Sequence, residues 1–125
     1  MGDLYCDLMG RPSITLYSGT HATSGDNTVV AAPGAGKALV LFYLQVQNES
    51  TTDTTVLVKH GSTQVGRAVL AGKDALVREW AGDYLCVLPA NTALVVNLSG
   101  ANSHGVVVEY TIMPCLLYTS PSPRD

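Results

Sequence analysis

Alternation of apolar and polar residues with a period of two is the feature that most limits what this chain can fold into. Runs of this kind recur along the whole sequence, whereas the three-to-four-residue spacing of an amphipathic helix is almost absent. Short segments rich in Gly, Pro, Asn and Asp separate the runs, and these residues supply the backbone angles that turns require. The pattern therefore predicts an all-β chain.

These runs predict nine strands. We expect them at residues 13–18, 27–32, 37–48, 54–61, 64–70, 75–80, 83–89, 92–99 and 104–113. Eight to nine short strands at this spacing favour one antiparallel β-sandwich, most naturally jelly-roll-like, with a small barrel as the alternative. We place the sandwich domain at residues 21–114, preceded by residues 1–20 as an N-terminal arm or a first strand.

The longest expected strand, KALVLFYLQVQN at residues 37–48, is apolar on both faces. Strict alternation gives two opposite sets of side chains: Leu39, Leu41, Tyr43 and Gln45 on one face, and Val40, Phe42, Leu44 and Val46 on the other. A strand of this kind lies at the centre of a sheet or against a partner subunit. This excess of apolar surface predicts self-assembly.

Composition excludes several classes of partner. Only 14% of the residues are charged and the net charge is -3, which predicts no nucleic-acid partner. The longest nearly apolar stretch is about half of the roughly twenty residues that a membrane-spanning helix needs. The first residues also lack the basic start and apolar core of a signal peptide. We therefore expect no membrane partner.

No motif in the sequence predicts catalysis. The stretch APGAGK at residues 32–37 lacks the first Gly and the final Ser or Thr of a phosphate-binding loop, so we interpret it as a Pro-Gly turn. No nucleophile elbow occurs. Paired carboxylates, as in a carbohydrate-active β-sandwich, depend on spatial proximity that a sequence does not show. We expect a protein that is not an enzyme and has neither catalytic residues nor a cofactor.

Histidines and cysteines likewise predict no metal site. His21, His60 and His104 lie on separate segments without ligands at zinc spacing, and we expect His60 and His104 at solvated strand ends. Three widely spaced cysteines, an odd number, predict free thiols rather than a disulfide framework. Cys86, in an apolar stretch, is expected to be buried.

Several aromatic and apolar residues are candidates for an interface. Trp80, the single Trp, and the nearby Tyr84 fit either a core or subunit interface or an aromatic platform for a glycan. The first twenty residues fit an arm that docks on a neighbour, a frayed terminus or an ordinary first strand. The candidate interface residues are Leu4, Tyr5, Leu8, Met9, Phe42, Trp80 and Tyr84.

The last eleven residues, CLLYTSPSPRD at 115–125, differ from the rest of the chain. A back-translation of all eleven resembles the transposase-type adapter used to build short-read sequencing libraries. We therefore interpret residues 115–125 as a non-native, adapter-derived tail on a chain from a metagenomic assembly, and we exclude them from arguments about function. The alternative is a natural Pro- and Ser-rich tail.

Three segments carry a resemblance to a known family. They are SGDNTVVAAPGAGKALVLFYLQVQ, VLVKHGSTQVG and AGDYLCVLPANTALVVNLSGANSHGVVVEYTI, which together extend over residues 24–112. Their turns and strands resemble those of small structural proteins of tailed bacteriophages, β-sandwiches of which some decorate or cement the capsid as trimers. The shared Gly-Lys turn lies at residues 33–37, and the shared strand-end turn at Gly61, Ser62 and Thr63.

The resemblance implies a non-enzymatic virion protein assembled in the host cytoplasm. Its expected partners are further copies of itself, with a homotrimer favoured, and the major capsid protein. The alternative is a tail-fibre or receptor-binding module that recognises cell-surface glycans through Trp80 and Tyr84.

Overall fold

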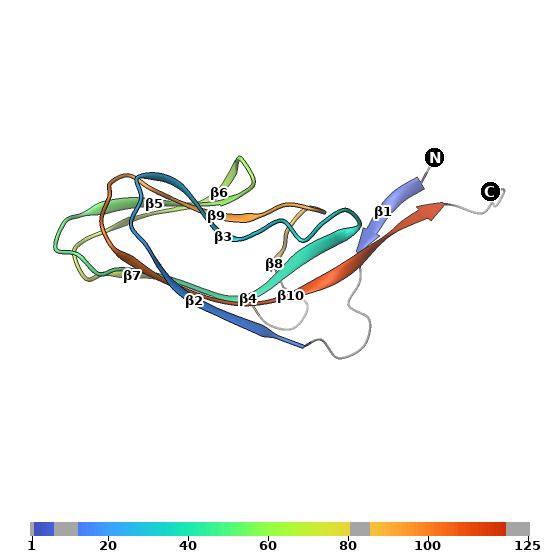
Figure 1. Ribbon diagram of the computed structural model, residues 1–125, viewed down its shortest axis with the longest axis horizontal. Helices are drawn as coiled ribbons and strands as arrows, with labels where there is room; N and C mark the ends of the chain where they lie inside the picture. Colours follow the sequence, from blue (N-terminus) through green and yellow to red (C-terminus); the bar gives the residue numbers. More distant parts are fainter. Residues whose placement is uncertain (1, 7–12, 81–85, 120–125) are drawn as a thin grey trace.

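The chain folds into two packed antiparallel sheets (Figure 1). The computed structural model describes the backbone of residues 2–6, 13–80 and 86–119, and the side chains of residues 13–80 and 86–115. The strands in these parts are β1 (Gly2–Cys6), β2 (Thr15–His21), β3 (Gly25–Val30), β4 (Lys37–Asn48), β5 (Thr54–His60), β6 (Thr63–Leu70), β7 (Ala75–Glu79), β8 (Cys86–Val87), β9 (Leu94–Leu98) and β10 (His104–Thr119).

The strand order is that of a jelly roll. The first sheet runs β2-β10-β4-β7, with β8 beside β4, and the second sheet runs β3-β9-β5-β6. Four antiparallel pairs are nested around the β5–β6 turn: β5 with β6, β4 with β7, β3 with β9 and β2 with β10. Successive pairs alternate between the sheets, as in a long hairpin rolled upon itself. The predicted all-β, jelly-roll-like sandwich is confirmed.

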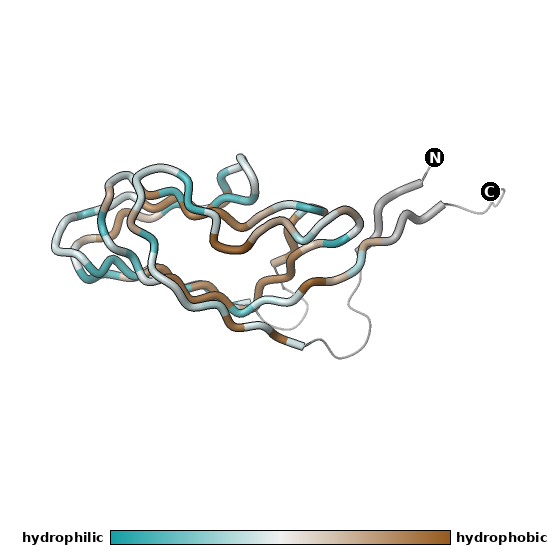
Figure 2. Tube along the Cα trace, viewed as in Figure 1, coloured by the Kyte–Doolittle hydropathy of each residue, from teal (hydrophilic) through white to brown (hydrophobic). Residues whose placement is uncertain are grey.

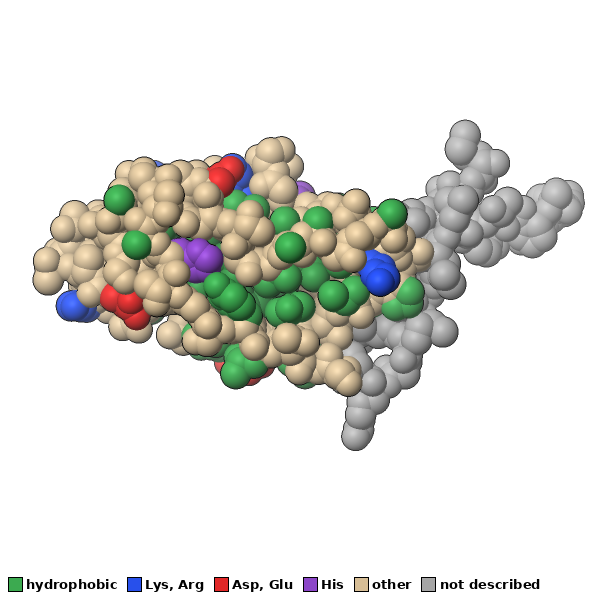
Figure 3. Space-filling view, viewed as in Figure 1, with side chains coloured by type: hydrophobic (Ala, Val, Ile, Leu, Met, Phe, Trp, Pro, Cys, Tyr) green, Lys and Arg blue, Asp and Glu red, His purple; other side chains and the backbone are tan. Residues whose placement is uncertain are grey.

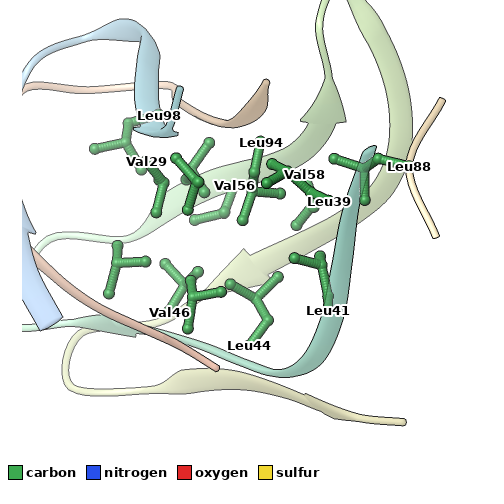
Figure 4. Packing of buried hydrophobic residues seen from close by; sticks show 14 of the residues in the cluster. Val29, Leu39, Leu41, Leu44, Val46, Val56, Val58, Leu88, Leu94 and Leu98 are labelled. Atoms are coloured by element: carbon green, nitrogen blue, oxygen red, sulfur yellow. The ribbon is translucent and has the colours of Figure 1, made fainter. Parts of the chain in front are cut away.

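The core lies between the two sheets. Figure 2 shows the hydrophobic stretches of both layers facing each other, and Figure 4 shows their side chains pointing into the shared interior. Leu39, Leu41, Leu44 and Leu94 are each at most 1% exposed. Because complete burial of one such side chain contributes about 1.5–3 kcal/mol, this cluster is the main favourable term in folding.

A β-bulge at Phe42 divides the long strand β4 into two halves. Glu109 of β10 pairs with Tyr43, but the next residue, Tyr110, pairs with Leu41, so Phe42 is an extra residue. The side chains that enter the core are therefore Leu39 and Leu41 before the bulge and Leu44 and Val46 after it. The predicted division of these side chains between two faces was wrong, because it assumed unbroken alternation.

The turn between β3 and β4 has the predicted chemistry. Gly34 and Gly36 have φ angles of 109° and 76°, in the left-handed region that favours glycine. The amide of Lys37 donates to the carbonyl of Gly34 at 3.2 Å, and the amide of Gly34 donates to Oδ1 of Asn91 at 3.0 Å. Residues 32–37 therefore form a turn that leads into a strand.

One end of the sandwich interior is polar. Asn48 is fully buried, and its Nδ2 donates to the carbonyl of Thr52 at 2.7 Å while its Oδ1 accepts from the Oγ of Ser50 at 2.7 Å. His104 is also fully buried, and its Nδ1 donates to the carbonyl of Asn102 at 2.7 Å. The predicted solvated position of His104 was wrong, because it has the inward orientation of Val106 two residues later.

The two terminal segments pair with each other. β1 runs antiparallel to residues Cys115–Thr119 of β10, and the two strands project together beyond the two layers (Figure 1). Cys115 is disulfide-bonded, so its prediction as a free thiol was wrong. Cys6 lies opposite Cys115 in the strand register. Cysteine spacing in the sequence does not predict this pair, because the two residues lie near opposite ends of the chain. Cys86 is a free thiol, as predicted.

The adapter origin of residues 115–125 stays a prediction. If it is correct, the pairing of β1 with Cys115–Thr119 belongs to the fused chain and is absent from the natural protein. β10 pairs with β2 up to Tyr110 and with β4 up to Pro114, so these strand pairs lie outside the tail. Cys115, a tail residue, contacts the sandwich through a 2.7 Å hydrogen bond from its amide to the carbonyl of Gly36 and through packing beside Val40 and Met113.

Candidate assembly interface

Phe42 and Trp80, two predicted interface residues, lie on neighbouring stretches of the first sheet. The amide of Trp80 donates to the carbonyl of Phe42 at 3.0 Å. Their side chains nevertheless belong to different clusters. Trp80 packs against the main core, whereas Phe42 packs against a smaller cluster that contains Val40 and Met113. The two residues are therefore adjacent in the backbone, but their side chains pack in different clusters.

The other five predicted residues are only partly accounted for. Leu4 and Tyr5 lie in β1, opposite Leu117 and Leu116 in the register. Their side chains, together with residues Leu8, Met9 and Tyr84, fall outside the part of the chain that the structure describes. Their role at an interface stays a prediction.

The outward surface of the first sheet, here called the first outer face, is a regular grid of twelve residues. Core residues such as Tyr17, Leu76, Val106 and Val108 alternate with them along the strands, which directs the twelve away from the core. The cross-strand rows, in the order β2, β10, β4, β7, are Leu16–Glu109–Tyr43–Glu79, Ser18–Val107–Gln45–Val77 and Thr20–Gly105–Gln47–Ala75.

Charge is sparse on the first outer face. Among the twelve grid residues Glu79 and Glu109 are the ionisable carboxylates and none is basic, while the carboxylate of Glu49 lies over Gly105 of the same face. Neither grid glutamate has an ion pair among the described residues. Leu16 is 63% exposed and Val77 is 48% exposed, so apolar side chains stand at both outer strands of the grid. Exposed apolar side chains of this kind are typical of surfaces that other proteins cover.

Some of the grid is preorganised. The hydroxyl of Tyr43 donates to Oε1 of Gln45 at 2.6 Å, which holds two central side chains of β4 against each other. At the end of the grid the carboxylate of Glu49 lies over Gly105 and its Oε1 accepts from the Oγ of Ser103 at 2.9 Å, which fixes a further side chain on this face. A fixed, flat surface loses little conformational entropy when it is covered.

Apolar exposure continues around one edge of the sandwich. Figure 3 shows hydrophobic side chains gathered in a band between the two layers, with charged side chains few and placed toward the periphery. The edge strands of the two sheets here are β2 and β3. Exposed Ile14 and Leu16 belong to β2 or the residues just before it, and exposed Ile112 lies in β10 just beyond its pairing with β2.

The outward surface of the second sheet, the second outer face, is different in character. One of its cross-strand rows is Asp26–Asn97–Leu57–Arg67, which begins and ends on the edge strands β3 and β6, and Lys59 lies on the inner strand β5. Both carboxylate oxygens of Asp26 accept from Nζ of Lys59 at 3.0 Å, and Oδ1 also accepts from Nδ2 of Asn97 at 2.7 Å. These hydrogen bonds, first from Asn97 and then from Lys59, lower the pKa of Asp26.

Sequence reasoning missed the residues of the first outer face. Leu16, Val77 and Val107 all lie in predicted strands, but which face of a strand is outward depends on its register. On β4 the bulge at Phe42 reversed the assignment of Tyr43 and Gln45. The available signal was the absence of Lys and Arg from alternate positions of these four strands. The predicted strands already contained it.

Metal and membrane features are not evident in the part of the chain that the structure describes. Within it, no group of three or more His, Cys, Asp or Glu side chains is arranged to hold a metal ion. The same residues contain no helix of the length and apolarity needed to cross a membrane.

Comparison with known proteins gives no match, either to a protein-family model or to a curated protein sequence.

Proposed function

We propose that this chain is a non-enzymatic structural protein of a tailed-phage virion, a capsid decoration or cement subunit that assembles through its first outer face. The observation that carries the proposal is the grid itself: twelve outward residues on four strands with two carboxylates and no cation. Two charged residues in twelve match the 14% of the whole chain, so the features that suit burial by a neighbour are the lack of any cation in the grid and the exposure of Leu16 and Val77.

Area gives the expected extent of the contact. A standard interface involves about 20–30 residues on each side, so the twelve grid residues supply roughly half of it. The exposed residues Ile14 and Ile112 lie beside the end of the grid that contains Leu16, and they supply further contact. Two adjoining surfaces on one subunit suit a closed ring, because each copy then meets its neighbours through different patches.

Cementing requires a stable scaffold and buried surface, with no chemical step. Any subunit that binds only the assembled shell stabilises it by mass action. The jelly roll supports this role, since the fold is common among viral capsid domains. Fold alone does not assign function, and lectins share the same architecture. The packing of Trp80 against the core leaves less of its ring free to act as the glycan platform of the alternative function.

The first test is the mass in solution of residues 1–125 and of residues 1–114, measured by light scattering after size-exclusion chromatography. We expect both chains to form a trimer, at three times the chain mass, which for the full chain is 13.1 kDa. A trimer only with residues 115–125 present would assign assembly to the tail. A monomer in both cases would contradict the proposed use of the first outer face.

A second measurement separates virion assembly from general self-association. Capsid shells of a tailed phage, prepared without their own decoration protein, are sedimented with the trimer. Co-sedimentation and a raised disruption temperature of the shell are the expected results. A trimer that binds none of the shells, but binds cell-surface glycans on an array, would favour the receptor-binding alternative.

A further inference from the structure

A pocket of about 340 Å³ opens at the edge of the sandwich opposite β2 and β3. Its walls come from β4, β7 and β8 of the first sheet and from β5, β6 and β9 of the second. Leu41 and Leu44 form one side, and Val58 and Leu94 lie across from them (Figure 4). All four are buried. The deep part of the pocket is therefore apolar.

Missing side-chain volume on β6 is one reason for the pocket. Gly66 lies on the pocket wall. Ala68 and Leu70, two and four residues later on the same side of β6, pack in the core, so Gly66 also faces inward. A Cβ added at Gly66 would meet only Val58, at 3.5 Å, which is ordinary van der Waals contact. The space is thus not forced by backbone strain, and a larger residue would fit there and fill it.

Trp80 and Cys86 line the same pocket. Trp80 is half-buried and packs on the core, which presents an aromatic ring to anything that enters. Burial raises the pKa of the Cys86 thiol, so this group stays neutral at ordinary pH. Both residues add to the apolar character of the pocket.

Basic residues line part of the pocket. Three lining residues are basic: Lys59, His60 and Arg78. The ammonium of Lys59 is already paired with Asp26 on the second outer face. Arg78 is exposed and has no ion pair among the described residues, and none of the described lining residues is acidic. A guanidinium carries its charge at all ordinary pH values and forms forked hydrogen bonds with carboxylate, sulfonate or phosphate groups.

We propose that this pocket binds a small amphipathic anion, with an apolar, preferably aromatic, body between the sheets against Trp80 and its anionic group on Arg78. The volume lies at the lower end of the range of ligand sites, about 300–1,000 Å³, so the body has about one or two rings. The site is separate from the first outer face. Its existence does not depend on the proposed virion function.

Two probes of similar shape test the assignment on the full chain. Anilinonaphthalene sulfonate carries an aromatic body and one negative charge, and phenylnaphthylamine has a similar body without the charge. Trp80 is the only Trp in the chain, so quenching of its emission reports a probe bound to the subunit, and the variants at Gly66 show whether that probe lies in the pocket. We expect saturable binding of both probes with one site per chain, and tighter binding of the anion.

Variants at two positions decide between this pocket and other apolar surfaces. Gly66→Ile fills the space and should abolish binding of both probes, while Gly66→Ala adds only a methyl group and should retain it. Arg78→Met keeps the apolar stem and should weaken the anionic probe about tenfold and the neutral probe less than twofold. A cooperative thermal transition for each variant verifies folding.

Three results would overturn the assignment. Absence of saturable binding to the full chain would show that the pocket takes no such ligand. Binding that survives Gly66→Ile would place the probes on the exposed faces instead. Equal weakening of the binding of both probes in Arg78→Met would show that the ligand's negative charge does not contribute to recognition.

Discussion

The two outer faces of the sandwich have the same geometry and opposite chemistry. Each is a four-stranded antiparallel surface with outward residues in register. The first outer face has two unpaired glutamates among twelve residues, with Tyr43 and Val107 near its centre. The second outer face carries the Asp26–Lys59 ion pair and adds Arg67.

This difference teaches which face is adapted to water. On the second face Asp26 and Lys59 pair within the chain, while Arg67 is exposed and hydrated, so covering this face would cost the desolvation of a guanidinium. On the first face the inner-strand residues are neutral except for Glu109, and neither Glu109 nor Glu79 has an ion pair among the described residues. Covering that surface therefore costs the desolvation of one inner carboxylate unless a basic group of a neighbour pairs with it.

The largest effect is expected from a charge placed on the first outer face. Val77→Lys puts an ammonium beside Gln45, on an edge strand where the side chain is 48% exposed, so the folded subunit tolerates it. Assembly would bury that charge, with the rim residue Glu79 of the same strand as its nearest carboxylate. We expect the trimer to become a monomer, seen as a threefold loss of mass by light scattering.

The matched control is the same substitution on the second outer face. Val69 is 62% exposed and also lies on an edge strand, β6. Val69→Lys should leave the trimer intact. If both variants dissociate equally, or if only Val69→Lys does, then the contrast between the two faces does not predict the interface.

A smaller effect is expected from removing a charge at the centre of the first outer face. Glu109 lies on β10, an inner strand, and has no ion pair among the described residues. Glu109→Gln abolishes the cost of desolvating a carboxylate on self-assembly. The dissociation constant of the trimer should fall about tenfold, which corresponds to about 1.4 kcal/mol, as measured by dilution in sedimentation equilibrium.

Glu79, in the same cross-strand row, is the control for Glu109. It lies on the edge strand β7 and is exposed, and charges at the rim of an interface contribute little to affinity. Glu79→Gln should therefore change the dissociation constant much less. Weakened assembly in Glu109→Gln would instead show that this carboxylate pairs with a basic group of the neighbouring subunit.

Much of the fold could be predicted from the sequence, because strand runs and turns are local features. Each of the nine expected strands corresponds to an observed one, although the expected strand at residues 83–89 is described only as Cys86–Val87. The turn at residues 32–37 followed from Pro and Gly alone. The nested pairing also follows from chain order once a jelly roll is chosen.

Features that depend on pairing between distant strands could not be predicted. The bulge at Phe42 arises from how β4 meets β10, about seventy residues later, and the sequence of β4 alone does not signal it. The disulfide of Cys115 depends on a contact between the two terminal segments. Burial of His104 depends on its position as the first residue of a strand between β2 and β4.

Incomplete prediction of the candidate interface has the same origin. Phe42 and Trp80 were chosen because they are large and aromatic, yet both pack within the subunit. The residues of the first outer face are individually ordinary, such as Ser18, Gln45 and Val77. Their significance comes from lying in one charge-poor surface, and only the register of four strands brings them together.

The smallest effect is expected on the second outer face, where Asp26 is paired with groups of its own chain. The folded chain lowers the pKa of Asp26 below its ordinary value of 3.8 through hydrogen bonds from Asn97 and Lys59. Its ionised form therefore stabilises the fold at pH values above 3.8, and this contribution is lost as the pH falls through the lower pKa of the folded state. Asp26→Asn should lower the melting temperature slightly at pH 7 and leave it unchanged near pH 2, with trimer mass unaffected throughout.

Asp53→Asn, which removes an exposed carboxylate that has no ion pair among the described residues, is the control for loss of charge alone. A change in trimer mass in Asp26→Asn would show that the second face takes part in assembly, because a pair that only satisfies its own subunit has no influence on a neighbour.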